Sequence, residues 1–302
     1  AKKKLLELNM PKEANEMGAA TIGTIHSVCL RFIQKYWYLI GISPDCQQMD
    51  ENDFNSYVDR SLFEQVAEED MLRLEEWRKT LDWKKNDGKG EKPYIAFWRD
   101  WLRTMVNKVR YYHIDDLEQS REKSITEIEA VFSRYVYDDE EYKKCKKDLD
   151  SALLDLENGN NARTRNAAKD RREYLKTYDP KTCNGKVEIK VLRGIEDVFQ
   201  AWELYASRVV FSDDWKEAAI NIVDKLFDIL IQWREEYQRY KQTRKMLDFN
   251  DMEVYFSQLL EKDEVKAEIR NYKLVLVDEF QDCNPMQIDI FKRISDLVPR
   301  SI

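Results

Sequence analysis

Two adjacent acidic residues, Asp278 and Glu279, follow directly after the apolar run Leu274–Val277. Such a run is the pattern of a strand covered on both faces in a parallel sheet, and ligand sites in these sheets lie beyond the carboxyl ends of the strands. An aspartate there can hold Mg²⁺ through the water shell of the ion, and a neighbouring glutamate can deprotonate a water that attacks a phosphate. The spacing therefore predicts a magnesium-assisted phosphate-hydrolysis site. The simpler alternative is an ordinary strand that ends in an acidic turn.

The residues after this pair divide into one chemical candidate and one helix start. Gln281 carries a side-chain amide that both donates and accepts hydrogen bonds, which suits a sensor of the terminal phosphate. Asn284, Pro285 and Gln287 fit the N-cap, the first helical position and the third helical position. We therefore expect these three residues to cap a helix rather than to take part in chemistry.

The elements that must position these residues are mostly helical. From residue 28 to about residue 246, apolar residues recur at spacings of three and four, the period of an amphipathic helix. A first helix is predicted over residues 28–40, with Gly41 as its C-cap and Pro44 preventing its continuation. Two further helices are predicted over residues 50–67 and 93–111. Three apolar stripes at helical spacing are interpreted as core: Ile125, Ile128, Phe132 and Tyr135; Val198, Trp202, Tyr205 and Val209; and Ile222, Val223, Leu226, Ile229, Leu230 and Trp233.

Short β-type runs at residues 20–25 and 273–277 flank this helical region. Inside it, residues 84–92 are predicted to form a solvated loop, and residues 178–190 a turn or a small hairpin. The stretch 158–172 is locally basic and is interpreted as a solvated helix face. The alternative is a phosphate contact made by Arg163, Arg165, Lys169, Arg171 and Arg172.

The bulk composition restricts the class of protein. With 302 residues, 43% of them hydrophobic, the chain is long and apolar enough to bury a core. A net charge of -8 argues against a uniformly basic nucleic-acid coat but leaves room for a local basic groove. Five scattered cysteines without a C-x-x-C pair argue against a zinc site and indicate reduced thiols. Because no apolar run approaches the roughly 20 residues that span a bilayer, we expect a cytoplasmic protein without membrane contact.

Three segments together resemble one family. VDEFQDCNPMQ at Val277–Gln287 resembles motif II of the UvrD/Rep-type superfamily 1 DNA helicases. TIGTIHSVCLRF at Thr21–Phe32 resembles motif Ib of that family. MLDFNDM at Met246–Met252 resembles the segment by which the chain re-enters the first RecA-like domain. The three segments occur in the order that the family has.

The resemblance implies a predominantly α-helical chain, in which a large helical insertion is flanked by partial RecA-like α/β segments of a parallel sheet. Residues 1–27 would be part of the first RecA-like domain (1A) with motif Ib. Residues 28–246 would be the helical insertion, called subdomain 1B, and residues 247–302 would return to 1A with motif II. An insertion of this length is typical of an elaborated branch of the family, such as the recombination-nuclease type.

The resemblance also implies an ATP-dependent DNA helicase or translocase of repair or recombination, moving 3′ to 5′, with ATP and Mg²⁺ as cofactors. Asp278 would hold Mg²⁺ through water, Glu279 would be the general base, and Gln281 would couple the nucleotide to DNA. The implied partners are single-stranded DNA, junctions of single- and double-stranded DNA, and a second nuclease or helicase subunit.

Motif Ib implies that Thr24, His26 and Ser27 face the DNA backbone, where short polar side chains and histidine can donate to phosphate oxygens. From the residues alone, the preferred interpretation of His26 is a helix-start residue whose hydrogen bonds are satisfied by neighbouring backbone. Asp248 and Asp251 fit an N-cap and its partner at the third helical position, and the resemblance does not change that expectation.

The phosphate-binding loop G-x-x-x-x-G-K-[ST] is absent from the sequence, since Gly88-Lys89 and Gly185-Lys186 lack its spacing and its Ser or Thr. We therefore expect an interior fragment that alone neither hydrolyses ATP nor unwinds DNA, and that binds no cofactor tightly. One alternative is a helical DNA- or protein-binding module without a catalytic role. Another is a helical scaffold without a nucleotide site, which would be favoured if residues 20–25 and 273–277 did not lie side by side in one sheet.

Overall fold

The computed structural model describes residues 3, 7, 9–12, 20–86 and 91–299. They form mostly α-helices, with one parallel and one antiparallel two-stranded sheet, so the predicted fold class is confirmed. The chain divides into two compact units. Unit 1 comprises residues 1–65, 102–115 and 230–302, and unit 2 comprises residues 66–101 and 116–229.

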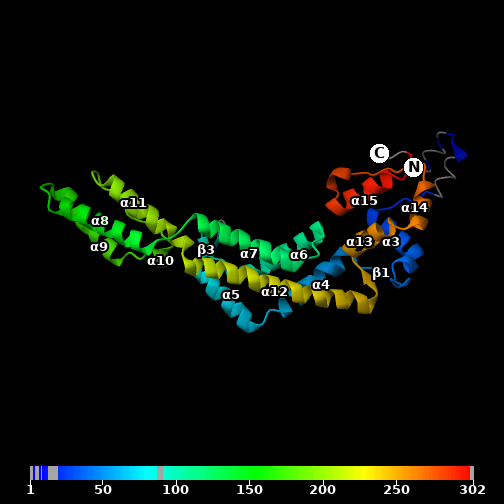
Figure 1. Ribbon diagram of the computed structural model, residues 1–302, viewed down its shortest axis with the longest axis horizontal. Helices are drawn as coiled ribbons and strands as arrows, with labels where there is room; N and C mark the ends of the chain where they lie inside the picture. Colours follow the sequence, from blue (N-terminus) through cyan, green and yellow to red (C-terminus); the bar gives the residue numbers. More distant parts are fainter. Residues whose placement is uncertain (1–2, 4–6, 8, 13–19, 87–90, 300–302) are drawn as a thin grey trace. The chain divides into compact units, whose positions relative to one another are not determined.

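Unit 1 is built on two helices that pack against each other, α3 (Ile25–Tyr36) and α13 (Phe249–Leu259), drawn in blue and orange in Figure 1. Their apolar faces meet in a core where the rings of Phe32 and Phe256 lie 5.2 Å apart. The short strands β1 (Gln47–Gln48) and β4 (Met246–Leu247) pair in parallel and connect distant parts of the chain. The other elements of unit 1 are η1 (Trp37–Leu39), α4 (Glu51–Glu64), α14 (Asp263–Arg270), η3 (Phe280–Asp282) and α15 (Pro285–Ser295).

Unit 2 has its own core around the buried Trp202, whose ring packs against Tyr178 and Phe199. Three helices surround this core (Figure 1): α8 (Asp139–Glu157), α9 (Ala162–Thr177) and α11 (Glu196–Ser207). The other elements of unit 2 are α5 (Glu68–Thr80), β2 (Lys84–Asn86), β3 (Glu91–Pro93), α7 (Leu117–Arg134), α10 (Pro180–Cys183) and η2 (Arg208–Phe211). Two helices contribute residues to both units, α6 (Phe97–Tyr112) and α12 (Asp213–Arg244).

The helix ends follow the local sequence signals. Gly41 has a φ of 71° and donates its N–H to the carbonyl of Trp37, which confirms its predicted role in ending the first helix. The stripes on α11 and α12 supply core residues, as predicted. The prediction that the stripe on α7 is core is not met to the same degree, because none of its members is fully buried: Ile125, Ile128, Phe132 and Tyr135.

The prediction of regular strands at residues 20–25 and 273–277 is wrong. Helix α3 already begins at Ile25, and β pairing in the second segment is confined to Val275. A strand needs neighbours for its peptide groups, and the only sheets among the described residues are β1–β4 and β2–β3. Thr21 Oγ1 lies 3.3 Å from the hydroxyl oxygen of Tyr272, the residue just before the second segment. The two segments therefore do not lie side by side in one sheet, the arrangement that was stated above to favour a helical scaffold.

Two interruptions of the helical pattern also have more structure than expected. In place of the loop predicted at residues 84–92, β2 and β3 pair with Lys84 opposite Pro93, and residues 87–90 lie outside the described part. In the segment 178–190, the helix α10 is followed by a turn in which Asn184 and Gly185 have φ values of 52° and 70°. The predicted turn is thus confirmed, and these thirteen residues contain no strand.

Candidate functional site

The three predicted catalytic residues lie together on one exposed turn. Glu279 adopts a left-handed conformation, with φ 52° and ψ 40°, and the 3-10 helix η3 follows it directly. The backbone N–H of Glu279 donates to Asp278 Oδ1 over 3.1 Å, and the side-chain amide of Gln281 donates to Glu279 Oε2. Asp278, Glu279 and Gln281 are all exposed. The turn thus presents two carboxylates and one amide side by side to solvent.

This turn stores backbone strain at Glu279. A left-handed conformation costs a non-glycine residue about 1–3 kcal/mol, and such residues gather at functional sites. The strain is held by η3, where the N–H of Asp282 donates to the carbonyl of Glu279 over 2.9 Å. A single exposed carboxylate such as that of Asp278 fits Mg²⁺, because this ion keeps several of its waters and takes only one or two carboxylates from a protein.

The helix after the turn begins as predicted. Asn284 is the N-cap of α15, Pro285 occupies its first position, and Gln287 completes a reciprocal capping box. The side-chain oxygen of Asn284 accepts from the N–H of Gln287 over 2.8 Å, and the side-chain oxygen of Gln287 accepts from the N–H of Asn284 over 3.3 Å. The C-terminal end of the turn at residues 278–282 is therefore fixed by this cap.

The predicted DNA-facing residues form the first turn of α3. Thr24 is the N-cap and accepts from the N–H of Ser27 over 3.3 Å, while the hydroxyl of Ser27 donates to the carbonyl of Thr24 over 2.8 Å. Both side chains are exposed. His26 points into the protein instead, where its ring stacks on Phe249 at 4.0 Å with an angle of 11° between the planes.

His26 is held by a buried glutamate that the sequence interpretation did not single out. Glu253, in α13, is only 1% exposed, and its carboxylate collects four partners. Its Oε1 lies 2.9 Å from His26 Nε2 and 2.6 Å from the amide nitrogen of Gln287. Its Oε2 lies 2.9 Å from His113 Nε2 and 3.0 Å from the amide nitrogen of Asn284. The side chain that satisfies His26 is thus also the one that holds the start of α15.

The electrostatics of Glu253 follow from these contacts. Burial on its own would raise the pKa of this carboxyl, but the hydrogen bonds from His113, His26, Asn284 and Gln287 outweigh it and hold the pKa well below its usual range. An ionised carboxylate only accepts, so each histidine donates through Nε2. A sequence signal did exist for Glu253: it lies on the apolar face of α13, four residues after Phe249 and three before Phe256.

The segment that resembles the re-entry into the first RecA-like domain forms a second buried polar cluster. Asp248 is the N-cap of α13 and Asp251 its partner in a capping box, as predicted. The ammonium group of Lys241 lies 3.0 Å from Asp248 Oδ2 and 2.6 Å from Asp251 Oδ2, and the hydroxyl of Tyr237 donates to Asp248 over 2.7 Å. Lys241 and Tyr237 were not predicted, since they precede the segment on α12.

The two carboxyls of this cluster differ in pKa. Burial raises the pKa of Asp251 to about 6, and the neighbouring charge of Asp248 adds to this effect. Burial opposes ionisation of Asp248 as well, but Lys241 and the hydrogen bond from Tyr237 hold its pKa below the usual value. Lys241 is therefore needed to balance two buried acids, which is a structural role.

The basic stretch 158–172 falls on helix α9. Arg172 pairs with Asp150 and Glu157 on α8, at 2.9 and 2.8 Å, and Arg171 donates to the carbonyl of Lys190 over 2.9 Å. These two arginines therefore stabilise unit 2 itself. The other three basic residues of the stretch 158–172 also lie on α9, and a phosphate contact by them stays a prediction: Arg163, Arg165 and Lys169.

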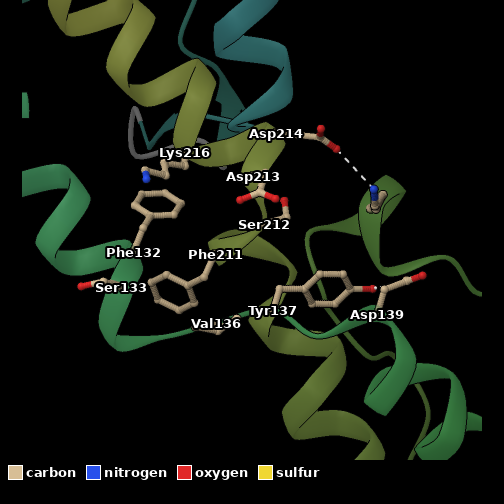
Figure 2. Close-up of a pocket in the computed structure, with 11 residues that line it drawn as sticks. Phe132, Ser133, Val136, Tyr137, Asp139, Phe211, Ser212, Asp213, Asp214 and Lys216 are labelled. Carbon is tan, nitrogen blue, oxygen red and sulfur yellow. Dashed lines mark hydrogen bonds and ion pairs between the residues drawn. The ribbon is translucent and has the colours of Figure 1, made fainter.

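A hollow in unit 2 contains none of the predicted site residues. This pocket, of about 420 Å³, lies between the end of α7 and the start of α12. Figure 2 shows the rings of Phe132, Phe211 and Tyr137 at its wall. Asp214, also at the pocket, pairs with Lys181 at 3.3 Å. Acidic and basic residues are mixed around it, so its charge does not favour a phosphate ligand.

Some kinds of site are not found in the described part of the chain. None of the five cysteines forms a disulfide. Within the described ranges, no three residues of the types His, Cys, Asp and Glu are grouped so that they could hold a metal ion among them. No described helix is both long enough and apolar enough to cross a membrane.

Comparison with known proteins gives the family of this chain. The UvrD/REP helicase N-terminal domain family matches residues 2–298, and the chain therefore belongs to this family. Three similar proteins are each named as one subunit of an ATP-dependent helicase/nuclease. The one from Desulfitobacterium hafniense is 27% identical over 91% of this chain and 24% of its own length. Those from Pediococcus pentosaceus and Bacillus pumilus are 23% and 24% identical, over 97% and 95% of this chain and 27% of their own lengths.

The chain thus spans about a quarter of the length of the curated relatives it matches.

Proposed function

We propose that this chain is the part of an ATP-dependent DNA helicase that carries one half of the ATP-hydrolysing site and one part of the path for single-stranded DNA. The observation that carries the proposal is the meeting of two motif segments on one side chain: Glu253 binds both His26 of the motif Ib segment and Asn284 of the motif II segment. Family membership over residues 2–298 supports the same assignment.

At the nucleotide side, Asp278 would hold Mg²⁺ through water, and the ion, when bound with ATP, neutralises charge on the phosphates. Glu279 accepts a proton from the attacking water and orients it. Gln281, whose amide donates to the carboxylate of Glu279, keeps that carboxylate directed along the turn and senses the state of the nucleotide.

At the DNA side, the first turn of α3 presents exposed hydroxyls and free backbone N–H groups, which favour a phosphate. The hydroxyl hydrogen of Ser27 is already donated to the carbonyl of Thr24. Thr24 therefore has the hydroxyl that is free to donate to a phosphate oxygen. His26 uses Nε2 for Glu253, so a direct bond from His26 to a phosphate requires the protonated imidazole, which donates through Nδ1 as well.

The finer features of the proposal concern the longer protein. Residues 1–27 and 247–302 would belong to the first RecA-like domain and residues 28–246 to the helical insertion, which would contact duplex or single-stranded DNA at a junction. Movement would be 3′ to 5′ in repair or recombination. Because the relatives are each named as one subunit of a helicase/nuclease, a second nuclease or helicase subunit is the partner that we expect.

A binding measurement on the 302-residue chain tests the DNA side. We expect it to bind a labelled oligo-dT, with an affinity that falls steeply as salt is raised, because phosphate contacts release counterions. Thr24→Ala should weaken binding severalfold, whereas Thr126→Ala, an exposed threonine in α7, should not. Equal loss in both variants would contradict a contact at α3. No binding at low salt would favour the second candidate, a helical module for a protein partner, for which the separate core of unit 2 is the supporting observation.

We also propose that this chain alone neither hydrolyses ATP nor unwinds DNA. The backbone amides and the lysine of the phosphate-binding loop normally hold the nucleotide phosphates, and no such loop occurs in the sequence. Incubation of the chain with ATP, Mg²⁺ and single-stranded DNA should release no phosphate above the background rate. Robust release would contradict this proposal.

A further inference from the structure

The carboxylate of Glu253 joins three segments of unit 1 that are far apart in the sequence. His26 is separated from it by 227 residues, His113 by 140 and Gln287 by 34. Each carboxylate oxygen receives two hydrogen bonds, which is the full number that its lone pairs can accept. No partner can therefore move without leaving a buried acceptor or donor unpaired.

Glu253 also decides how the cap of α15 is oriented. The amide nitrogens of Asn284 and Gln287 both point at the carboxylate, which leaves their amide oxygens for the two backbone N–H groups of the capping box. If either amide were turned around, its oxygen would face the carboxylate and its nitrogen would face an N–H donor. The capping box is thus held in register by the same carboxylate that binds His26.

We propose that Glu253 is a positioning residue that couples the DNA-facing start of α3 to the turn that carries Asp278 and Glu279. The inference rests on the proposed function, because it takes the first turn of α3 as a contact of single-stranded DNA. Glu253 itself touches neither DNA nor nucleotide in this account. Its role is to transmit the position of one segment to the other.

The hydrogen-bonded connection through Glu253 is held in place by neighbouring contacts at both of its ends. His26 lies between Thr24 and Ser27 within one helical turn, and its ring is clamped on Phe249, which belongs to the same helix as Glu253. At the other end, Asn284 follows the last residue of η3 by two positions. A shift of the α3 start on phosphate binding therefore either moves the start of α15 or breaks a hydrogen bond to a buried charge.

A purely structural anchor would hold the same contacts but would not respond to DNA. Hydrogen exchange separates the two roles when it is measured on the 302-residue chain with and without an oligo-dT. The informative amides are those of Asp282, Gln287 and Ile288, each of which donates to an acceptor in the turn or in the cap. If Glu253 couples the segments, DNA should slow their exchange by about fivefold or more, a typical size for coupling between sites.

Two variants test whether Glu253 carries the effect. Glu253→Gln keeps the shape of the side chain but replaces one acceptor oxygen by a donor. Gln287→Met leaves the charge of Glu253 but removes one of its four hydrogen bonds, together with the capping-box bond from the N–H of Asn284. In both variants the oligo-dT should still bind through Thr24, but its slowing of exchange at Asp282 and Ile288 should be lost. Gln287→Met serves alone if Glu253→Gln does not fold.

Asp248→Asn is the matched control, since Asp248 is another buried carboxylate, the N-cap of the helix that carries Glu253, and asparagine is an equally good N-cap. This variant should keep the DNA-dependent slowing. If wild type binds the oligo-dT but exchange in residues 282–288 does not change, or if Gln287→Met keeps the change, the coupling role is contradicted while the proposed function stands. If wild type does not bind the oligo-dT at low salt, the proposed function itself fails.

Discussion

The Glu253 carboxylate is buried among four N–H donors and accepts a hydrogen bond from each. A glutamine amide of the same shape has only one acceptor oxygen and cannot accept all four. In Glu253→Gln, the new amide nitrogen faces two of the four donors, whichever way the side chain is turned. Each buried donor left without an acceptor costs about 1–3 kcal/mol. We therefore expect the free energy of unfolding to fall by about 2–5 kcal/mol in urea titrations at neutral pH.

The control for this change is Glu264→Gln, an exposed glutamate at the start of α14. It should alter the free energy of unfolding by less than about 0.5 kcal/mol. If Glu253→Gln were as stable as Glu264→Gln, the four contacts would not hold a charged carboxylate.

The same residue predicts a dependence on pH. The pKa of Glu253 is lowered in the folded protein, so its ionised form stabilises the fold fully above the unfolded pKa of about 4.3, and this contribution is lost as the pH falls toward the folded pKa. The difference in unfolding free energy between wild type and Glu253→Gln should thus be constant from pH 7 to about pH 5 and shrink below about pH 4. A difference that grows on acidification would contradict the direction of the shift.

Lys241 gives a second prediction because it is only 3% exposed and stands between the buried Asp248 and the half-buried Asp251. Lys241→Met keeps most of the apolar stem but leaves Asp248 and Asp251 without their cation. Removing one partner of a buried ion pair typically costs about 3–5 kcal/mol. Denaturant unfolding should show a loss of this size, whereas Lys292→Met, at an exposed position of α15, should show almost none.

The helix starts could be predicted because their chemistry is local. Asn284, Pro285 and Gln287 specify the beginning of α15 within four residues, and Asp248 and Asp251 do the same for α13. The same holds for the turn at Asn184 and Gly185, whose residue types tolerate a left-handed backbone. Signals that lie within one turn of chain can be read without knowledge of the fold.

The cluster at Glu253 could not be predicted in the same way. Its partners come from α3, from the residue that follows α6 and from the start of α15, and only tertiary packing brings these segments together. The two predicted strands failed for a related reason, since a strand forms only where a neighbouring strand takes its peptide groups. A local sequence pattern does not show which hydrogen-bonding groups a segment far away in the chain will supply.

Substitutions at two glycines test how closely helix α11 approaches the turn at Gly185 in unit 2. Gly41 and Gly185 both have positive φ values, 71° and 70°, but a Cβ at Gly41 would meet nothing within 4 Å. A Cβ at Gly185 would lie 2.3 Å from the backbone oxygen of Ala206 at the end of α11. Gly41→Ala should cost about 1–2 kcal/mol for the left-handed backbone alone, and Gly185→Ala about 3 kcal/mol or more. Circular dichroism in urea measures both; equal losses would mean that α11 does not approach the turn so closely.

On the scale of the whole molecule, each unit has its own buried core, one around α3 and α13 and one around Trp202. All the segments that resemble family motifs lie in unit 1, together with Glu253 and its partners. The two-unit division therefore separates the proposed site from the helices α7 to α11. An overall charge of -8 is compatible with DNA binding, because phosphate contacts need basic or donor groups only where the strand runs, and the contact proposed in unit 1 is a single helix start.

The most direct test of the central claim uses the proposed longer helicase that would contain this chain. It compares phosphate release from ATP with and without single-stranded DNA in wild type and in Glu279→Gln. If Glu279 is the general base of a DNA-stimulated ATPase, the stimulated rate should fall by about 10²–10⁴-fold in the variant, while binding of the oligo-dT persists. A variant that hydrolyses ATP as fast as wild type in the presence of DNA would contradict the account.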